Sequence, residues 1–219
     1  MDLIALLKFG SREHMEPLVK EGALYMRPIS YFIDLEEGDD RRGDKHEALT
    51  AYHQGPGTSI TIDGKHELSF EAGTLKFLTI RNDDEKACNI FCLTAVTPTY
   101  WQVDPKIDNL GDTCVIIYKP TIFLERFRQA AKPICVQLQT GPVEYVPQSS
   151  YAGPMGPFKK FAEGYAHQNE FRCLVRPGSP DPITLKIGSL EDIAELGPRD
   201  AINRALARDV GTRLGHPLP

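Results

Sequence analysis

The apolar run NIFCLTAV, residues 89–96, constrains the fold of this chain more than any other stretch. Apolar side chains occupy nearly every position of the run, so its two faces do not alternate between apolar and polar. A strand with this composition is covered on both of its faces. The sequence therefore predicts a central strand at 89–96, and other strands of the chain must lie beside it.

Further strands and a few helices are spread unevenly along the chain. Ser11 is expected to cap the start of a helix and Gly22 to end it. Asp63-Gly64 predicts a β-hairpin. Strands are predicted over 3–9, 23–26, 59–63, 66–73, 75–81, 112–119, 170–176 and 183–189, with a hairpin over 136–147. Helices are predicted over 11–22, 30–35, 120–132, 158–164, 190–196 and 199–211.

This order does not alternate strand and helix regularly, as a doubly wound fold does. We expect an α+β fold: a single domain over residues 1–212, with a split sheet that is mixed or mostly antiparallel, and a few helices. Residues 36–56 are expected to form a charged surface loop, because 36–47 are almost wholly charged. Residues 213–219 are expected to form a loose C-terminal tail.

Composition excludes several classes of protein. The chain has 219 residues and a net charge of -5, which argues against a protein that coats nucleic acid through its phosphates. No apolar run approaches the roughly 18 residues that cross a bilayer, and the N-terminus does not resemble a signal peptide, so we expect a cytoplasmic protein with no membrane partner. Its cysteines lie singly, at spacings typical of neither disulfides nor zinc sites. The chain also lacks Walker, GxGxxG, GxSxG and HExxH motifs.

Acidic residues gather in the charged segment and offer hard oxygen ligands to a divalent metal. They are Asp34, Glu36, Glu37, Asp39, Asp40 and Asp44. A metal-dependent phosphoesterase that uses them is one alternative function. However, the spacing does not match an EF-hand, and Arg41 and Arg42 compete for the same carboxylates. We therefore expect no metal site here, and interpret the segment as a lid or a recognition loop.

The stretch FKKFAEGYAHQNEFRCLVR, residues 158–176, carries the strongest candidate for a catalytic group. Glu170 opens an alternating strand, in which Glu170, Arg172 and Leu174 share one face. A carboxylate at the start of a strand is held rigidly while its head can face a cleft. The alternative is structural: Glu170 and Arg172, two residues apart on one face, pair with each other or with neighbours.

Three short motifs together resemble the ADP-ribosyltransferase-like superfamily, in particular its bacterial toxin and anti-phage members. Lys8-Phe9-Gly10 resembles the end of the first strand, where the superfamily carries His or Arg to grip NAD. Thr94 ends a strand similar to the one that offers a hydroxyl residue, although a single Thr replaces Ser-Thr-Ser. Gln168-Asn169-Glu170 resembles the Q-x-E that carries the catalytic glutamate of the superfamily.

The chain is also similar to an uncharacterised bacterial and phage family. That family has an LYxxPxxYF stretch, an RGDxxE loop and a late QxExR. In this sequence the three patterns begin at Leu24, Arg42 and Gln168.

The resemblance implies an NAD-dependent ADP-ribosyltransferase of a bacterial or phage conflict system, with NAD as substrate and a nucleic acid or a protein as acceptor. It implies that Glu170 stabilises an oxocarbenium-like transition state and that Gln168 orients the acceptor. The alternative on the same scaffold is a catalytically inactive module that binds a nucleotide or a protein.

Seven further residues are implied to bind NAD. Lys8, with Phe9 and Gly10 beside it, is expected to hold the phosphates or a ribose. Tyr25 or Tyr31 is expected to stack on nicotinamide. The remaining two are Arg42 and Thr94. We also expect Glu170→Ala to abolish NAD consumption and to leave the melting temperature nearly unchanged.

Overall fold

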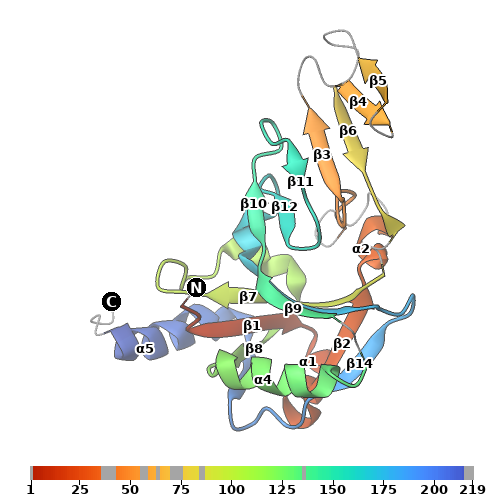
Figure 1. Ribbon diagram of the computed structural model, residues 1–219. Coiled ribbons are helices and arrows are strands. Elements are labelled where there is room, and N and C mark those ends of the chain that lie inside the picture. The colour runs from red at the N-terminus through yellow and green to blue at the C-terminus, as the bar shows by residue number, and fades with distance from the viewer. Residues whose placement is uncertain are drawn as a thin grey trace.

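The computed structural model describes residues 2–35, 43–54, 59–62, 65–69, 76–83, 87–134 and 137–214. The fold is α+β, with an eight-stranded sheet at its centre (Figure 1). Six strands follow one another across this sheet: β14 (Ile183–Lys186), β2 (Ala23–Pro28), β7 (Asn89–Val96), β1 (Ala5–Gly10), β8 (Thr113–Ile117) and β15 (Ala194–Pro198). β13 (Glu170–Arg176) pairs with β7 and also with β9 (Gln137–Pro142).

Strand β7 is the predicted central strand, and it is buried along nearly its whole length. One of its edges pairs with β13 from Asn89 to Thr94. Its other edge is shared, because β1 pairs only with residues 94–96 and β2 only with residues 89 and 90. The sheet therefore splits along this edge of β7, where β1 and β2 diverge. All the pairings within the eight-stranded sheet are antiparallel.

Helices cover both faces of the sheet. On one face, α1 (Arg12–Glu21) and α4 (Pro120–Ala131) bury Leu18, Phe123 and Phe127 against Leu6 and Phe91. On the other face, α5 (Ile202–Leu214) and the 3-10 turn η1 (Pro105–Leu110) pack on a second cluster of apolar side chains. This second cluster includes Ala5, Leu7, Phe9, Val96, Ile116, Ile202 and Leu206. Alternate residues of β1 thus enter opposite cores, as a strand requires.

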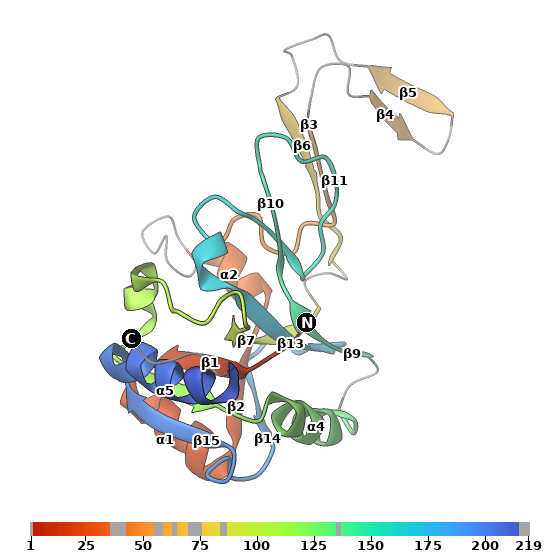
Figure 2. The same cartoon turned by 90° about the vertical axis from the view of Figure 1, so that its left-hand side faces the viewer.

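A narrow β-arm projects from this body (Figures 1 and 2). Its base contains α2 (Ser30–Asp34), the parallel pair β10 (Glu144–Val146) and β12 (Lys159–Phe161), and the 3-10 turn η2 (Ala166–Gln168). Its shaft is the three-stranded sheet of β11 (Gly153–Pro154), β3 (Ala51–Gln54) and β6 (Phe77–Ile80). Its tip is the antiparallel pair of β4 (Ser59–Ile62) and β5 (His66–Ser69). The β4–β5 pairing confirms the predicted hairpin, although 63–64 lie outside the described residues.

Several sequence expectations are wrong. Residues 36–56 are not simply a surface loop, because Asp44 and Glu47 are buried and 51–54 form β3. Residues 159–161 form a strand rather than a helical turn, because β10 is available to pair with them. The hairpin expected over 136–147 does not form, since β9 pairs with β13 and β10 with β12.

The C-terminal part differs too. Residues 194–198 form β15 rather than a short helix, because they pair with the edge of β8, and Gly197 and Pro198 are poor helix formers. The short 3-10 turn η3 (Arg199–Ala201) then leads into α5. The loose tail expected from residue 213 does not begin there, since α5 continues to Leu214; residues 215–219 lie outside the described part. Among the described helices, none is long and apolar enough to cross a membrane.

Candidate functional site

A pocket of about 850 Å³ opens where β1 and β2 diverge from β7. Residues of β1, β2 and β7 line its walls, together with residues of β13, β12, α1, α2 and the 3-10 turns η1, η2 and η3. The volume lies within the range of small-molecule and cofactor sites. The split of the sheet thus provides the cavity, because Phe91, Cys92 and Leu93 lie between the residues that pair with β1 and those that pair with β2.

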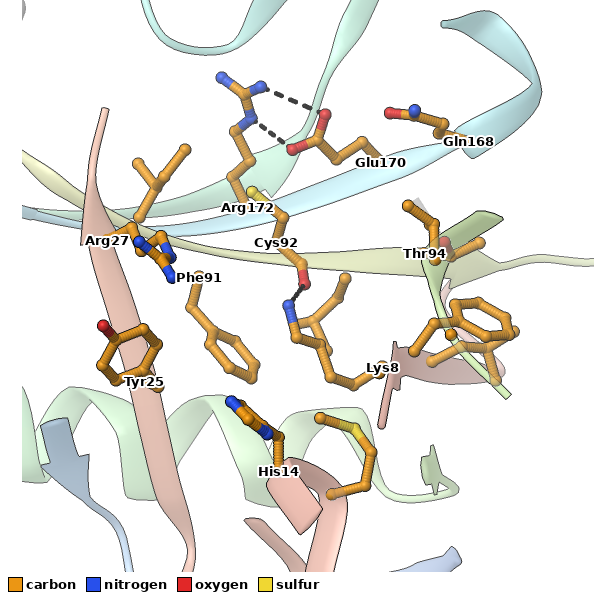
Figure 3. Close-up of a pocket in the computed structure, with 18 of the residues that line it drawn as sticks. Lys8, His14, Tyr25, Arg27, Phe91, Cys92, Thr94, Gln168, Glu170 and Arg172 are labelled. Atoms are coloured by element: carbon orange, nitrogen blue, oxygen red, sulfur yellow. Dashed lines mark hydrogen bonds and ion pairs between the residues drawn. The ribbon is translucent and has the colours of Figure 1, made fainter. Parts of the chain in front are cut away.

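Lys8 bridges part of this split. Its ammonium donates a hydrogen bond of 2.7 Å to the carbonyl of Cys92 and lies 4.4 Å from the centre of the Phe91 ring (Figure 3). A buried carbonyl without a partner costs free energy, so this bond replaces a missing ladder bond. One N–H of the Lys8 ammonium is therefore used by the backbone, whereas the sequence analysis expected this group to bind NAD.

The structure brings the predicted site residues together on this one pocket. Eight of the nine line it: Lys8, Phe9, Gly10, Tyr25, Tyr31, Thr94, Gln168 and Glu170. Arg42 lies outside the described residues. Thr94 stands directly opposite Glu170 in the β7–β13 ladder and opposite Leu7 in the β1–β7 ladder. The three motifs that carry the family resemblance therefore meet at one level of the sheet, while the roles of their residues stay predictions.

Glu170 pairs with Arg172, which is the structural alternative that the sequence left open. Its side chain is 7% exposed and accepts hydrogen bonds from Nε (2.7 Å) and Nη2 (3.2 Å) of Arg172 (Figure 3). The backbone N–H of Glu170 donates to the hydroxyl of Tyr145 at 3.0 Å. An ionised carboxylate offers about four lone-pair sites, and Arg172 takes two of them. Glu170 therefore keeps acceptor capacity for a ligand hydroxyl.

A second carboxylate and a lysine complete a buried charge cluster around Arg172. Glu47 accepts from Nη1 and Nη2 of Arg172, at 2.7 and 2.8 Å. The Lys160 ammonium lies 3.5 Å from Glu47, 3.6 Å from Glu170 and 3.7 Å from Asp44. Three carboxylates against two cations leave a formal surplus of one negative charge. This surplus can stabilise a positive charge that develops in the pocket.

The protonation states of the cluster follow from its geometry. Burial alone raises the pKa of Glu170, but the charges of Arg172 and Lys160 outweigh it and hold this pKa well below its usual range. The same balance lowers the pKa of Glu47. Asp44 differs, because burial raises its pKa above the ordinary value despite Lys160. Glu47 and Glu170 are therefore ionised at neutral pH.

Cys92 lies beside Glu170 on the pocket wall. Burial raises the pKa of its thiol, and the charge of Glu170 raises this pKa further. Since the thiolate is the reactive form, this cysteine is a poor nucleophile at neutral pH. The thiol instead adds a hydrogen bond to the Glu170 carboxylate.

The opposite part of the pocket carries aromatic and cationic side chains. The guanidinium of Arg27 lies 3.8 Å from the centre of the Tyr31 ring and 5.3 Å from that of Tyr25. Arg27 thereby covers one face of Tyr31, and Tyr31 also makes an edge contact with Phe32. Tyr25 is 45% exposed and is the better placed of the two predicted tyrosines for stacking on a flat ring.

Sequence reasoning missed several residues of this pocket. Glu47, Lys160, Arg27 and Arg199 line it, and none was singled out as a site residue. Glu47 and Lys160 were hidden in charged stretches typical of solvated loops and helix faces. The RGDxxE pattern was the signal that could have found Glu47, since it contains Asp44 and Glu47, but neither it nor QxExR contains Lys160.

Among the residues that the structure describes, no group of three or more His, Cys, Asp or Glu side chains is arranged to hold a metal ion. The acidic residues 36, 37, 39 and 40 lie outside the described part. Comparisons with protein-family models, curated proteins and solved structures find no match for this chain.

Proposed function

We propose that the chain is an NAD-dependent ADP-ribosyltransferase that binds NAD in this pocket and uses Glu170 to stabilise the transition state. The observation that supports this function best is the convergence of Lys8, Thr94, Gln168 and Glu170 on one cavity of nucleotide size. On the resemblance, we propose a bacterial or phage conflict system as its setting.

The charge of the pocket favours this ligand. The chain as a whole has a net charge of -5, yet outside the negatively charged cluster around Arg172 the cavity is lined by three cations, Lys8, Arg27 and Arg199, against the one carboxylate of Asp112. Such a concentration of cations on an acidic protein attracts an anion. With Tyr25 exposed on the same wall, the pocket suits a ligand that joins flat rings to phosphates.

The proposed reaction breaks the bond between the nicotinamide nitrogen and the ribose carbon. The bonding electrons leave with nicotinamide, and positive charge develops on the ribose. Glu170, ionised and facing the cavity, accepts a hydrogen bond from a ribose hydroxyl and stabilises that charge. A lone pair of the acceptor then bonds to the ribose carbon, and the acceptor releases its proton to solvent.

Gln168 is proposed to orient the acceptor. It ends η2, two residues before Glu170, and its side chain lines the same pocket (Figure 3). An amide both donates and accepts hydrogen bonds, which suits an acceptor from a nucleic acid base or a protein side chain. Lys8, Phe9 and Gly10 are proposed to border the NAD ribose or phosphates at the end of β1.

A second candidate function is nucleotide binding without transfer. It is favoured by the two hydrogen bonds between Glu170 and Arg172, which offset part of the carboxylate charge. In this case the pocket would select a nucleotide, and the cluster around Arg172 would be purely structural.

One experiment separates the two functions. NAD labelled in both its nicotinamide and its adenylate part is incubated with the protein and a mixture of protein, DNA and RNA. We expect NAD to raise the melting temperature, free nicotinamide to appear, and the adenylate label to enter one acceptor class. A raised melting temperature without free nicotinamide would establish the binding module instead. No effect of NAD would reject NAD-dependent transfer, and no effect of NAD or of a related nucleotide would reject both functions.

A further inference from the structure

Two segments that are distant in sequence meet beside the pocket, and the proposed transfer does not by itself explain why. Asp44 and Glu47 come from residues 43–47, and Glu170 and Arg172 come from the start of β13. Glu47 and Arg172 are 125 residues apart in the sequence, and both are almost fully buried, at 2% and 1% exposure.

Arg172 makes five hydrogen bonds, which is the full donor capacity of a guanidinium. Nε and one Nη2 hydrogen serve Glu170, while the other Nη2 hydrogen and one of Nη1 serve Glu47. The remaining Nη1 hydrogen serves the carbonyl of Pro157. Because these acceptors lie on different sides of a planar group, the guanidinium has one orientation that satisfies all of them. In that orientation its Nε edge faces Glu170.

This arrangement determines whether Arg172 binds Glu170 or the phosphates of a ligand. Arg172 lines a cavity proposed to take a ligand with phosphates, and arginine binds phosphate as readily as it binds carboxylate. A guanidinium that is free to turn would pair with the ligand and release Glu170. The two-point contact with Glu47 opposes this turn, since both of its oxygens hold Arg172 in place.

We infer that Glu47 is a positioning residue for Glu170: through its contact with Arg172, it keeps the guanidinium on Glu170 and away from the ligand phosphates. This inference rests on the proposed function, because a fixed Glu170 matters only if that carboxylate contacts the reacting ribose. Lys160 supports the arrangement by lying within 3.5–3.7 Å of all three carboxylates, which offsets their mutual repulsion.

The main test is Glu47→Gln, which keeps the size of the side chain but removes its charge and one acceptor. We expect kcat for nicotinamide release to fall by about 10–100-fold, because Glu170 is no longer held in its reactive orientation. KM for NAD should stay within about threefold of the wild-type value or fall, because Arg172 becomes able to bind the phosphates. Glu163→Gln, at an exposed glutamate that accepts a backbone N–H, is the matched control and should change neither constant.

A double variant tests whether Glu47 acts through Arg172. Arg172→Lys keeps the positive charge but loses the planar two-point contact. If Glu47 works only by holding Arg172, then Glu47→Gln combined with Arg172→Lys should be no slower than Arg172→Lys alone. Additive losses in kcat, or a Glu47→Gln variant with wild-type kcat, would overturn the positioning role.

A spectroscopic measurement tests the same role without turnover. The Nε–H signal of Arg172 in ¹⁵N–¹H NMR, assigned by its loss in Arg172→Lys, should exchange with water at least about tenfold faster in Glu47→Gln. If the wild-type protein releases no nicotinamide, the proposed function fails, and this exchange rate alone decides whether Glu47 fixes the pair. An unchanged rate would reject the positioning role.

A folding control accompanies both measurements. Circular dichroism and the melting temperature show whether Glu47→Gln remains folded. If it does not, Glu47→Asp replaces it, because Asp retains the charge but is too short to make the same two-point contact. An Asp variant with both the kcat and the Nε–H exchange rate of the wild type would equally overturn the inference.

Discussion

At the scale of single residues, the sequence identified the face of β13 correctly but not the partners of that face. Glu170 and Arg172 were expected on one face, and they line one pocket. Glu47 was missed as a site residue because its neighbours in sequence are charged, a pattern typical of solvated loops. Only the fold shows that Arg172, 125 residues away, pairs with Glu47 and so offsets the cost of burying its carboxylate.

Burial also revises the expectation that Glu170→Ala leaves the melting temperature unchanged. Alanine would leave Nε of Arg172 without its acceptor and would deprive Lys160 of one of its carboxylates. Breaking a buried ion pair by removing one partner costs about 3–5 kcal/mol. Glutamine, which keeps the volume and one acceptor, is therefore the more informative substitution.

The buried carboxylates predict how stability depends on pH. The pKa of Glu170 is lower in the folded chain than the value of about 4.3 expected when unfolded. Its contribution is therefore fully present above pH ~4.3 and is lost as the pH falls toward the folded pKa. Between pH 7 and pH 3, the free energy of unfolding of the wild-type protein should fall by at least about 1 kcal/mol more than that of Glu170→Gln.

Denaturant unfolding at the two pH values measures this difference. Asp44 works in the opposite direction because its pKa is raised, but it is present in both proteins and cancels in the comparison. Equal losses of stability in the two proteins would show that Glu170 is not ionised in a buried ion pair.

At the scale of elements, the turn from η2 into β13 sets the relation between Gln168 and Glu170. Asn169, between them, has a positive φ of 40°, and its side-chain amide donates a hydrogen bond of 2.7 Å to the carbonyl of Ala95. Asparagine tolerates this left-handed conformation better than most residues. The left-handed backbone of this turn therefore explains why asparagine suits the middle position of the Gln-Asn-Glu motif.

Asn169→Ala should destabilise the protein by about 2–3 kcal/mol, because the left-handed conformation costs about 1–2 kcal/mol and the lost hydrogen bond about 1 kcal/mol. Asn169→Gly removes only the hydrogen bond and should cost about half as much. Denaturant unfolding of both variants checks this order. Equal effects of the two substitutions would mean that the positive φ is not important here.

Local patterns failed where pairing with a distant strand decides the structure. The Lys159–Phe161 and Ala194–Pro198 segments have weak preferences of their own, and each became a strand because a sheet edge was available. The strongly patterned elements β7 and α4 were predicted closely, since their apolar residues alone define which faces are buried. Intrinsic propensity decides little when tertiary pairing opposes it.

At the scale of the whole molecule, the sequence predicted an α+β fold with a split sheet, and the structure adds where the split lies. β1 and β2 diverge along one edge of β7, and the pocket fills the gap between them. No local signal could locate this gap, because it depends on the registers of three strands. The projecting arm was also unexpected, since β3 lies within the segment interpreted as a loop.

The outer part of the arm is separable from the pocket proposed to bind NAD. Gln54 in β3 pairs directly with Phe77 in β6, so a short Asn-Gly turn can replace residues 55–76. We expect this variant to stay folded and to release nicotinamide within about twofold of the wild-type rate, since none of residues 55–76 lines the pocket. A loss of nicotinamide release in a folded variant would show that the arm contributes to the NAD site.

The central claim, that Glu170 promotes cleavage of NAD, is tested most directly by the rate of nicotinamide release from wild-type protein and from Glu170→Gln. Glu21→Gln, at an exposed glutamate paired with Lys186, serves as the matched control. We predict release by the wild type and the control, and a rate at least about 100-fold lower for a folded Glu170→Gln variant that still binds NAD. Equal rates in all three proteins, or no release from any of them, would contradict the claim.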